Sequence, residues 1–552
     1  MIDTEVHAPI NSDTEVQPAS TTTPIVEPIL QVNEIQGNSL GGFQKDHEVL
    51  MFLRITNVAI AKKWLQSLTP YIATAAEVIQ FNRLFKETRK RRYGREGTVR
   101  STFINIGFSF DGLKKLTPDA DQFTDEAFKE GLPKRSAALG DPTDPQAIGH
   151  PNNWVIGGPN SVPDVVVIVA SDDPSRLDEE VEWLTASLPT GLQIMFKQRG
   201  ETLPGALAGH EHFGFKDGVS QPGIRGRLSD HDSDFLTDRE DPVNHPDQGK
   251  IGQDLLHAGE FVFGYPTQIG EPDRDENGKA IDGLNVKEGP IATAGPTWAE
   301  NGSYLVFRRL RQDVKGFHAF LEATATMLSA QNPAFAGISA AKVGAKFVGR
   351  WASGAPIVKA PDQDNPALEN DVDFEFQAED DDPQGFKCPF AGHIRKAYPR
   401  DTERPLGSEE PFINESATQT RRLLRRGIPF GKPMASGCPM RSLLTLAGLK
   451  KLFQPNDDGD RGLLFLAYQT SITRQFEFVS QAWVSNPDFP DAGDGHDAIL
   501  GQSLDPSTRD RTIVLQAPGQ NSEVKLPTDW VIPTGGGYFF TPSISGLQHL
   551  AQ

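Results

Sequence analysis

Apolar residues in the first part of the chain alternate between short continuous runs and stretches with helical spacing. The mostly apolar runs at 49–53, 103–108 and 165–170 predict buried strands. Apolar residues spaced over 59–68 and 177–188 predict helices. The order strand, helix, strand, strand, helix is typical of a ferredoxin-like sheet with helices packed on one face.

A second group of elements begins near residue 302. The pattern predicts strands over 302–310 and 462–468, and helices over 314–328 and 472–483. We therefore expect an α+β protein made of two ferredoxin-like halves, each an antiparallel sheet with helices packed on it. No clear sequence repeat links the two halves.

The polar stretches define the expected domain boundaries. Residues 1–34 are polar, acidic and rich in Pro and Thr, which predicts a disordered tail. An N-terminal half over 35–300 and a C-terminal half over 301–552 follow this tail. Inserted loops are predicted at 228–250, 361–384 and 401–418.

Composition narrows the class of protein. The 552 residues carry 54 Lys and Arg against 74 Asp and Glu, a net charge of −20, which disfavours nucleic acid and anionic membranes as partners. Two cysteines, Cys388 and Cys438, occur without a CxxC or CxxCH motif, so a disulfide framework, a zinc site and c-type haem attachment are not expected. Neither a leader peptide nor an apolar run of about 18 residues is seen. We expect a cytoplasmic protein, with secretion left open.

Three segments contain candidate chemistry. In the first, 210–222, Asp217 lies between glycines, which let the backbone turn sharply and approach a flat ligand. An Asp-Gly pair is more often an ordinary turn. His210 and His212 could ligate a metal from one side of a strand, or their spacing is incidental.

The other two segments are basic. In residues 388–400, His393 lies among small apolar residues and basic residues follow it. A neutral imidazole can ligate haem iron and arginines can pair with its propionates, but a core histidine beside a basic run fits as well. In residues 421–431, arginines precede a Gly-Pro turn. One guanidinium could point into a cavity, or the run is a solvated basic face.

Taken together, the three segments carry a resemblance. GFKDGVSQP, CPFAGHIRKAYPR and LRRGIPFG occur in the order found in the dye-decolorizing peroxidases, which the chain resembles over residues 35–550. Asp217 occupies the GxxDG motif of this family. Further matches are IQGNSLGGF, GEFVFGYP, RGLLFLAYQTSI and GGGYFFTPSISGL. The length and insertions are most similar to the long branch found in fungi and some bacteria.

The resemblance implies a cofactor and a reaction. Haem b would be held non-covalently between the two halves, and hydrogen peroxide would oxidise dyes, phenols and similar one-electron donors. His393 would be the axial ligand of the iron, and Asp497 would accept a hydrogen bond from its imidazole. Asp217 and Arg425 would act on peroxide at the distal face, where Arg425 is preferred to Arg426 by its position in the motif.

Further positions follow from the same resemblance. Trp483 would relay electrons from the haem to bulky dyes, as an oxidisable aromatic near the surface, or it is a packing residue at the end of a helix. Two departures from the family occur: Tyr398 stands near a common Asn, and Phe430 stands where many fungal members have Tyr. Leu463 and Phe465 are expected in the distal pocket, with Arg395, Arg400, Tyr398, Gly218, Val219 and Ser220 at the haem edge.

Three alternatives stay open. A haem-carrying or iron-handling protein on the same fold would bind the cofactor with little turnover. A thiolate from Cys388 or Cys438 would replace the histidine ligand. A scaffold without haem would lack a Soret band. The protein is expected to be a monomer or a small homo-oligomer, without nucleic acid or membrane partners.

Overall fold

The computed structural model accounts for most of the chain. Cys438 and residues 1–26 of the predicted tail lie outside the described residues. The described residues are 27–91, 99–245, 247–269, 288–377, 382–402, 415–434, 459–505 and 509–552.

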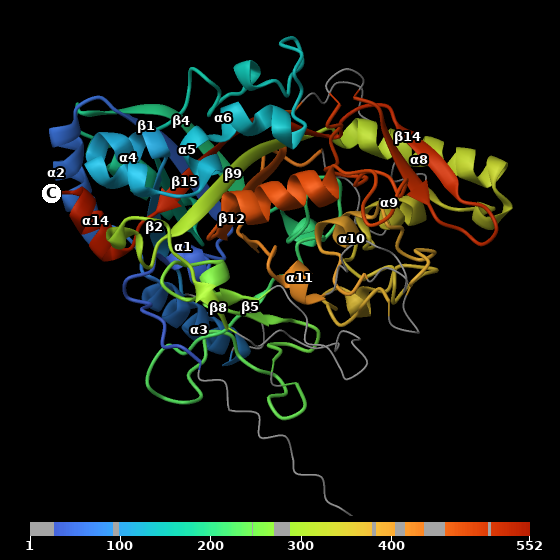
Figure 1. Cartoon of the computed structure of the whole chain (residues 1–552), viewed down its shortest axis with the longest axis horizontal. Coiled ribbons are helices and arrows are strands. Elements are labelled where there is room, and N and C mark those ends of the chain that lie inside the picture. The colour runs from blue at the N-terminus through green and yellow to red at the C-terminus, as the bar shows by residue number, and fades with distance from the viewer. Residues whose placement is uncertain are drawn as a thin grey trace, which may run out of the picture.

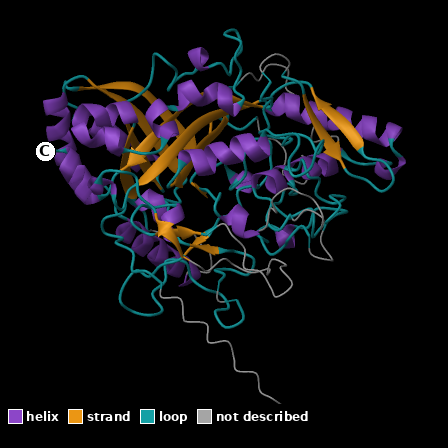
Figure 2. Ribbon diagram, viewed as in Figure 1, coloured by secondary structure: helices purple, strands orange, loops and turns teal. Residues whose placement is uncertain are grey.

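In the described part of the chain, nine strands form one antiparallel sheet (Figures 1 and 2). The neighbours run β10–β12–β9–β15–β2–β3–β1–β4, and β11 also pairs with β12. The first four strands are β1 (His47–Ile55), β2 (Thr102–Phe108), β3 (Val165–Ser171) and β4 (Leu192–Glu201). The others are β9 (Ser303–Gln312), β10 (Leu424–Arg425), β11 (Ile428–Phe430), β12 (Gly462–Gln469) and β15 (Val531–Thr541).

The two halves of the sheet have the same strand order. When the strands of each half are numbered along the chain, with β11 left aside, both halves have the spatial order fourth, first, third, second. These orders are β4–β1–β3–β2 and β15–β9–β12–β10. This order confirms the expected α+β class and the two ferredoxin-like halves. They share one sheet instead of forming separate sheets, because β15 pairs with β2 at Phe540 and Phe108.

The sheet curls until its two ends meet, because β4 packs against β11. Gly200 of β4 makes this contact possible: a Cβ atom there would lie 2.5 Å from Cγ2 of Ile428. The enclosed face is a continuous apolar core, which excludes water and stabilises the closed shape. Its members include Leu50, Phe52, Ile168, Phe307, Leu464 and Phe539.

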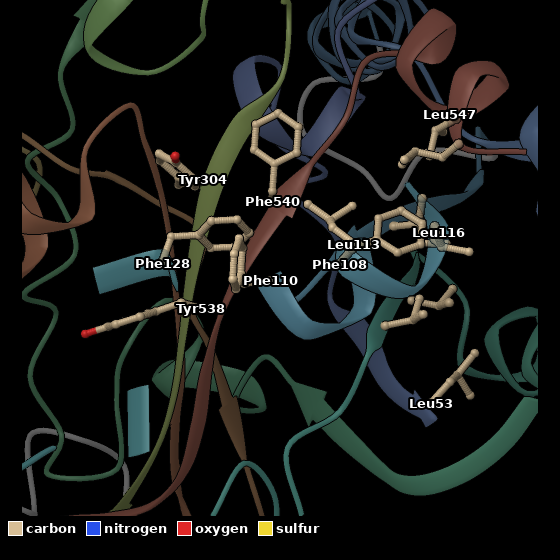
Figure 3. Packing of buried hydrophobic residues seen from close by; sticks show 14 of the residues in the cluster. Leu53, Phe108, Phe110, Leu113, Leu116, Phe128, Tyr304, Tyr538, Phe540 and Leu547 are labelled. Carbon is tan, nitrogen blue, oxygen red and sulfur yellow. The ribbon is translucent and has the colours of Figure 1, made fainter. Parts of the chain in front are cut away.

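Helices cover the outer face of the sheet with a second apolar core (Figure 3). Local signals begin these helices: Asn57 caps α2 by accepting from the Ile60 N–H, and Ser109 caps α4 by accepting from Gly112. Figure 1 shows α2, α4 and α14 gathered at the left, near the C-terminus. The covering helices are α2 (Val58–Leu68), α4 (Phe110–Leu116), α5 (Glu126–Glu130), α6 (Leu132–Arg135), α7 (Pro174–Ala186) and α14 (Ile544–Leu550).

A separate lobe of the second half lies at the right of Figure 1. It contains α8 (Val314–Gln331), α9 (Ala340–Val348) and the hairpin of β13 (Arg511–Leu515) and β14 (Ser522–Leu526). Beyond the sheet are α1 (Gly37–Leu40), α3 (Ala75–Arg91), α10 (His393–Ala397), α11 (Glu415–Gln419) and short strands β5 (Gly223–Ile224), β6 (Leu255–Leu256), β7 (Pro266–Gln268) and β8 (Glu288–Ile291). Within the described ranges, no helix is long and apolar enough to cross a membrane.

Two predictions of local structure need correction. The tail was expected to extend to residue 34, yet Leu30 and Val32 are buried, and Glu27 pairs with Arg225 at 3.0 Å. The apolar residues at the end of this segment reach the core, so order begins earlier. The predicted loop 401–418 contains the start of α11.

Candidate active site

Side chains from both halves surround a cavity of about 790 Å³. The loop 209–222 and the segment 421–429 form part of the wall, together with β12, α10 and the π-helix η11 (Val479–Val484). The volume and the mixture of apolar walls with a few charged groups are typical of a cofactor or small-molecule site. Apolar lining residues include Val219, Val348, Leu463, Phe465, Val484 and Leu500.

A fixed imidazole lies on one side of this cavity. His393 is the first residue of α10, and its Nδ1 lies 2.8 Å from Oδ2 of Asp497. The other oxygen of Asp497 accepts from the N–H groups of Ile499 and Leu500, both at 2.8 Å. This arrangement holds the proton on Nδ1 and leaves Nε2 free to act as a ligand. The expected hydrogen bond to Asp497 is therefore present.

The electrostatics of this pair favour an ionised Asp497. Burial raises the pKa of Asp497, but the neighbouring His393 and the two backbone N–H donors outweigh it, so the pKa is lowered. Burial lowers the pKa of His393, and the charge and hydrogen bond of Asp497 overcome this and raise it.

Asp217 and Arg425 face the same cavity. The loop that carries Asp217 turns at Gly214, whose φ of +91° is a glycine conformation. Oδ2 of Asp217 lies 3.9 Å from Nε2 of His393. Arg425 donates through Nη2 to the carbonyl of Ser220, and burial lowers its pKa while the charge of Asp217 opposes the decrease. The structure thus brings the two expected distal groups together.

The neighbouring arginine has a different environment. Arg426 donates to the carbonyls of Asn38 and Leu40, at 3.1 and 3.0 Å, and to that of Arg425 at 3.1 Å. Its guanidinium is therefore tied to α1, whereas the guanidinium of Arg425 lies beside Ser220 near Asp217. Both arginines line the cavity, and the charge of Asp217 acts on Arg425.

Most residues expected at the haem edge line the cavity. Tyr398 donates to Oδ2 of Asp254 at 2.7 Å, and Arg400 donates to the carbonyl of Val372 at 3.1 Å while Glu375 lies 3.5 Å away. The expected lining residues found there are Gly218, Val219, Ser220, Tyr398, Arg400, Leu463 and Phe465.

Arg395 is the exception. It does not line the cavity, and its guanidinium lies between the rings of Phe376 and Phe390, where it donates to the carbonyl of Cys388 at 2.9 Å. The cause is helical phase: two residues after His393 on α10, a side chain faces away from the surface that His393 uses. Arg395 packs the helix in place and does not reach the cofactor site.

The expectation that Trp483 lies near the surface is also wrong. Its side chain is only 5% exposed, stacked on Phe489 with ring centroids 5.6 Å apart and edge-on to Phe478. Its helical neighbours Val479 and Val484 line the cavity, and Trp483 lies behind them. It is one layer away from the cavity but has little contact with solvent.

Three other candidate ligands are absent from the cavity in a usable form. Both ring nitrogens of His210 lie beside carbonyls, of Ala208 at 3.1 Å and Ala352 at 3.0 Å, and Nε2 of His212 lies 2.8 Å from that of Phe430. Cys388 is buried outside the lining, and burial raises the pKa of its thiol to about 12. Over the described ranges, no cluster of three metal-ligating side chains occurs.

Two residues of the site were missed from sequence. Glu211 and Arg350 both border the cavity. Arg350 is fully buried, and its Nε and Nη2 have no hydrogen-bond partner, although Nη1 donates to the carbonyls of Gly354 and Asp371. The segment GRWASGAP around Arg350 carries no motif, so no local pattern marks this residue.

Comparison with known proteins agrees with this geometry. A family model described as the DyP dimeric alpha+beta barrel domain matches residues 34–204. A dye-decolorizing peroxidase of Mycetinis scorodonius is 30% identical over 94% of this chain and 87% of its own. The solved structure of an ancestral D-type dye-decolorizing peroxidase is 31% identical, with a TM-score of 0.72 over 94% of this chain and 99% of its own.

A further solved structure is a dye-decolorizing peroxidase in complex with 2,6-dimethoxyphenol, 28% identical with a TM-score of 0.66, covering 95% of this chain and all (100%) of the other. Peroxidases of this family are haem-dependent. A ligand-ready imidazole, an acid and a guanidinium facing one cavity, on a fold shared along nearly the whole length, lead to one conclusion: the chain belongs to the dye-decolorizing peroxidase family.

Proposed function

We propose that this protein binds haem b non-covalently and uses hydrogen peroxide to oxidise phenols and dyes. The observation that carries the proposal is the cavity itself, because Nε2 of His393, Asp217 and Arg425 all face it. Bound haem would supply an iron that takes two oxidising equivalents from peroxide and releases them as one-electron oxidations. The rest of the chemistry belongs to side chains of this chain.

The residues present fit such a group. The apolar walls suit a porphyrin, and His393 offers a neutral nitrogen. Arg350 supplies a second argument: a buried guanidinium with two unpartnered groups favours an anion at the edge of the cavity. We propose that Arg350, together with Arg400, binds the haem carboxylates. The absence of CxxCH supports non-covalent binding.

Asp217 and Arg425 would carry out the proton and charge chemistry. Peroxide must lose a proton from one oxygen and gain one on the other before the O–O bond breaks. An ionised Asp217 can accept and return that proton, while Arg425 stabilises the developing negative charge.

Reductants would reach the site in two ways. A small phenol would donate at the cavity, in keeping with the dimethoxyphenol complex of the similar structure. A bulky dye would donate at the protein surface, and Trp483, one layer behind the lining, would pass the electron inward. The acid and guanidinium on the cavity wall have no use in a passive carrier, so they favour turnover over haem transport.

The test is peroxide-dependent oxidation of 2,6-dimethoxyphenol by haem-loaded protein. We expect steady turnover by the wild type and, for Arg425→Leu, a loss of activity at full haem content. Haem binding without peroxide-dependent oxidation would instead identify a carrier. A protein that takes up no haem would contradict both functions.

A further inference from the structure

Glu211 organises the loop that ends at Asp217. Its Oε2 accepts from the N–H of Phe213 at 2.6 Å, and its Oε1 accepts from the N–H of Phe215 at 2.9 Å. Its backbone closes the same turn, since its carbonyl accepts from Gly214 at 2.9 Å and its N–H donates to Phe215 at 3.1 Å. The side chain and the backbone of Glu211 together hold the turn over residues 211–215.

The turn is also fastened to the sheet and to the C-terminal lobe. Gln312, the last residue of β9, donates through Nε2 to Oε2 of Glu211. Phe213 packs on Phe317 of α8, with ring centroids 4.3 Å apart. Asp217 follows this anchored turn by two residues, so its position relative to His393 is inherited from the anchors.

The buried position of Glu211 disfavours the ionised form of its carboxyl group. Burial, with the nearby charge of Asp217, raises the pKa of Glu211 to about 8. Oε2 accepts from two donors and Oε1 accepts from one, so a protonated carboxyl can carry its hydrogen on Oε1 and keep all three bonds. A neutral Glu211 keeps these hydrogen bonds, so they do not depend on its charge.

We propose that Glu211 is a positioning residue for Asp217 in peroxide activation. It acts through the loop, by holding the backbone of residues 213–215 against β9, and it does not touch peroxide. This inference rests on the proposed function, because it matters only if Asp217 handles the peroxide proton. A purely structural role would instead affect folding and all steps of turnover alike.

The test is a double-mutant cycle on haem-loaded enzyme, with the rate of forming the first oxidised form measured by stopped flow. Glu211→Gln keeps the size of the side chain but loses one backbone bond. Because small displacements of a reacting group can cost up to about 100-fold, we expect a decrease of about 10-fold or more. In an Asp217→Asn background, the same change should cost less than about twofold, since coupled residues are not additive.

Three measurements keep the result interpretable. Haem content, the Soret band and the rate of reduction by a small phenol should stay at wild-type values in Glu211→Gln.

A second variant, Gln312→Ala, removes the β9 anchor and should slow activation in the same non-additive way. It replaces Glu211→Gln in the test if that variant does not fold. Glu260→Gln is the matched control: Glu260 is another buried carboxyl whose pKa is raised by burial, and it lies outside the cavity lining, so activation should not change.

The outcomes separate the two hypotheses. Equal losses from Glu211→Gln in both backgrounds, or slower phenol oxidation to the same degree, would overturn the positioning role and leave the proposed function intact. An Asp217→Asn variant that activates peroxide at the wild-type rate would overturn the role of Asp217 and, with it, this inference.

Discussion

The two sides of the cavity are built in opposite ways. On the proximal side, Asp497 is fully buried and His393 is 11% exposed, and both hydrogen-bonding oxygens of Asp497 are occupied. On the distal side, the Asp217 side chain is 31% exposed, on a loop without regular secondary structure. The proposed iron ligand is therefore held by fixed partners, whereas the proposed proton-transfer group extends a partly exposed side chain from an anchored loop.

The largest effect is expected from removing the histidine on the proximal side of the cavity. His393→Ala removes the nitrogen that faces the cavity, so haem should be lost or held with an altered spectrum. The measurement is haem content per protein after purification, with His549→Ala, a half-exposed histidine outside the cavity, as the control. Added imidazole should restore part of the spectrum. Full haem content with an unchanged spectrum would show that another residue ligates the iron.

The second prediction concerns substitutions of the distal groups, with the proximal histidine left in place. Arg425→Leu and Asp217→Asn should each slow peroxide activation by roughly 10²–10⁴-fold, the usual contribution of acid–base groups, at normal haem content. Stopped-flow absorption measures this rate. Arg426→Leu, whose contacts are with α1, should lower Tm without slowing activation. If Arg426→Leu slows activation and Arg425→Leu does not, the two arginines have been assigned in the wrong order.

The third prediction weakens the proximal side without removing it. In Asp497→Asn the carboxylate that accepts from Nδ1 becomes neutral, so the imidazole donates less to iron. Loss of such a partner typically costs 10–100-fold in metal affinity or activity, and the reduction potential should rise. Haem transfer to an apoprotein acceptor and a potentiometric titration measure both effects. An unchanged potential would argue that Asp497 only packs.

The fourth prediction concerns the route out of the site and has the smallest effect. Trp483→Phe should lower oxidation of a bulky anthraquinone dye several-fold and leave 2,6-dimethoxyphenol oxidation unchanged. Trp183→Phe is the comparison, because Trp183 is 43% exposed and its ring centroid lies 5.1 Å from that of the exposed Tyr71. A selective loss in Trp183→Phe alone would move the exit to that pair.

The motifs predicted the proximal side better than its surroundings. His393 and Asp497 were found because each sits in a recognisable segment, and their hydrogen bond follows. Arg395 lies in the same segment as His393, but the phase of a five-residue helix decides which side chains face the cavity. Trp483 was expected near the surface, and its burial depends on Phe489, which no local pattern connects to it.

The contributions of Glu211 and Arg350 could not be predicted for a different reason. Glu211 matters through backbone N–H groups of its own loop, and any sequence of similar composition has such groups. Arg350 stands out only when its unpartnered nitrogens are counted. In the fold, β15 was missed because Gly535, Gly536 and Gly537 suggest a turn, although they lie opposite Arg309, Arg308 and Phe307 within the sheet.

The most direct test of the whole account is an absorption spectrum of haem-loaded protein before and after one equivalent of hydrogen peroxide. We predict a histidine-type ferric spectrum before peroxide is added and the spectrum of an oxidised form within seconds of adding it. Two equivalents of a one-electron donor should then restore the starting spectrum. A thiolate-type spectrum, or no change on adding peroxide, would contradict the claim that His393, Asp217 and Arg425 form a peroxidase site.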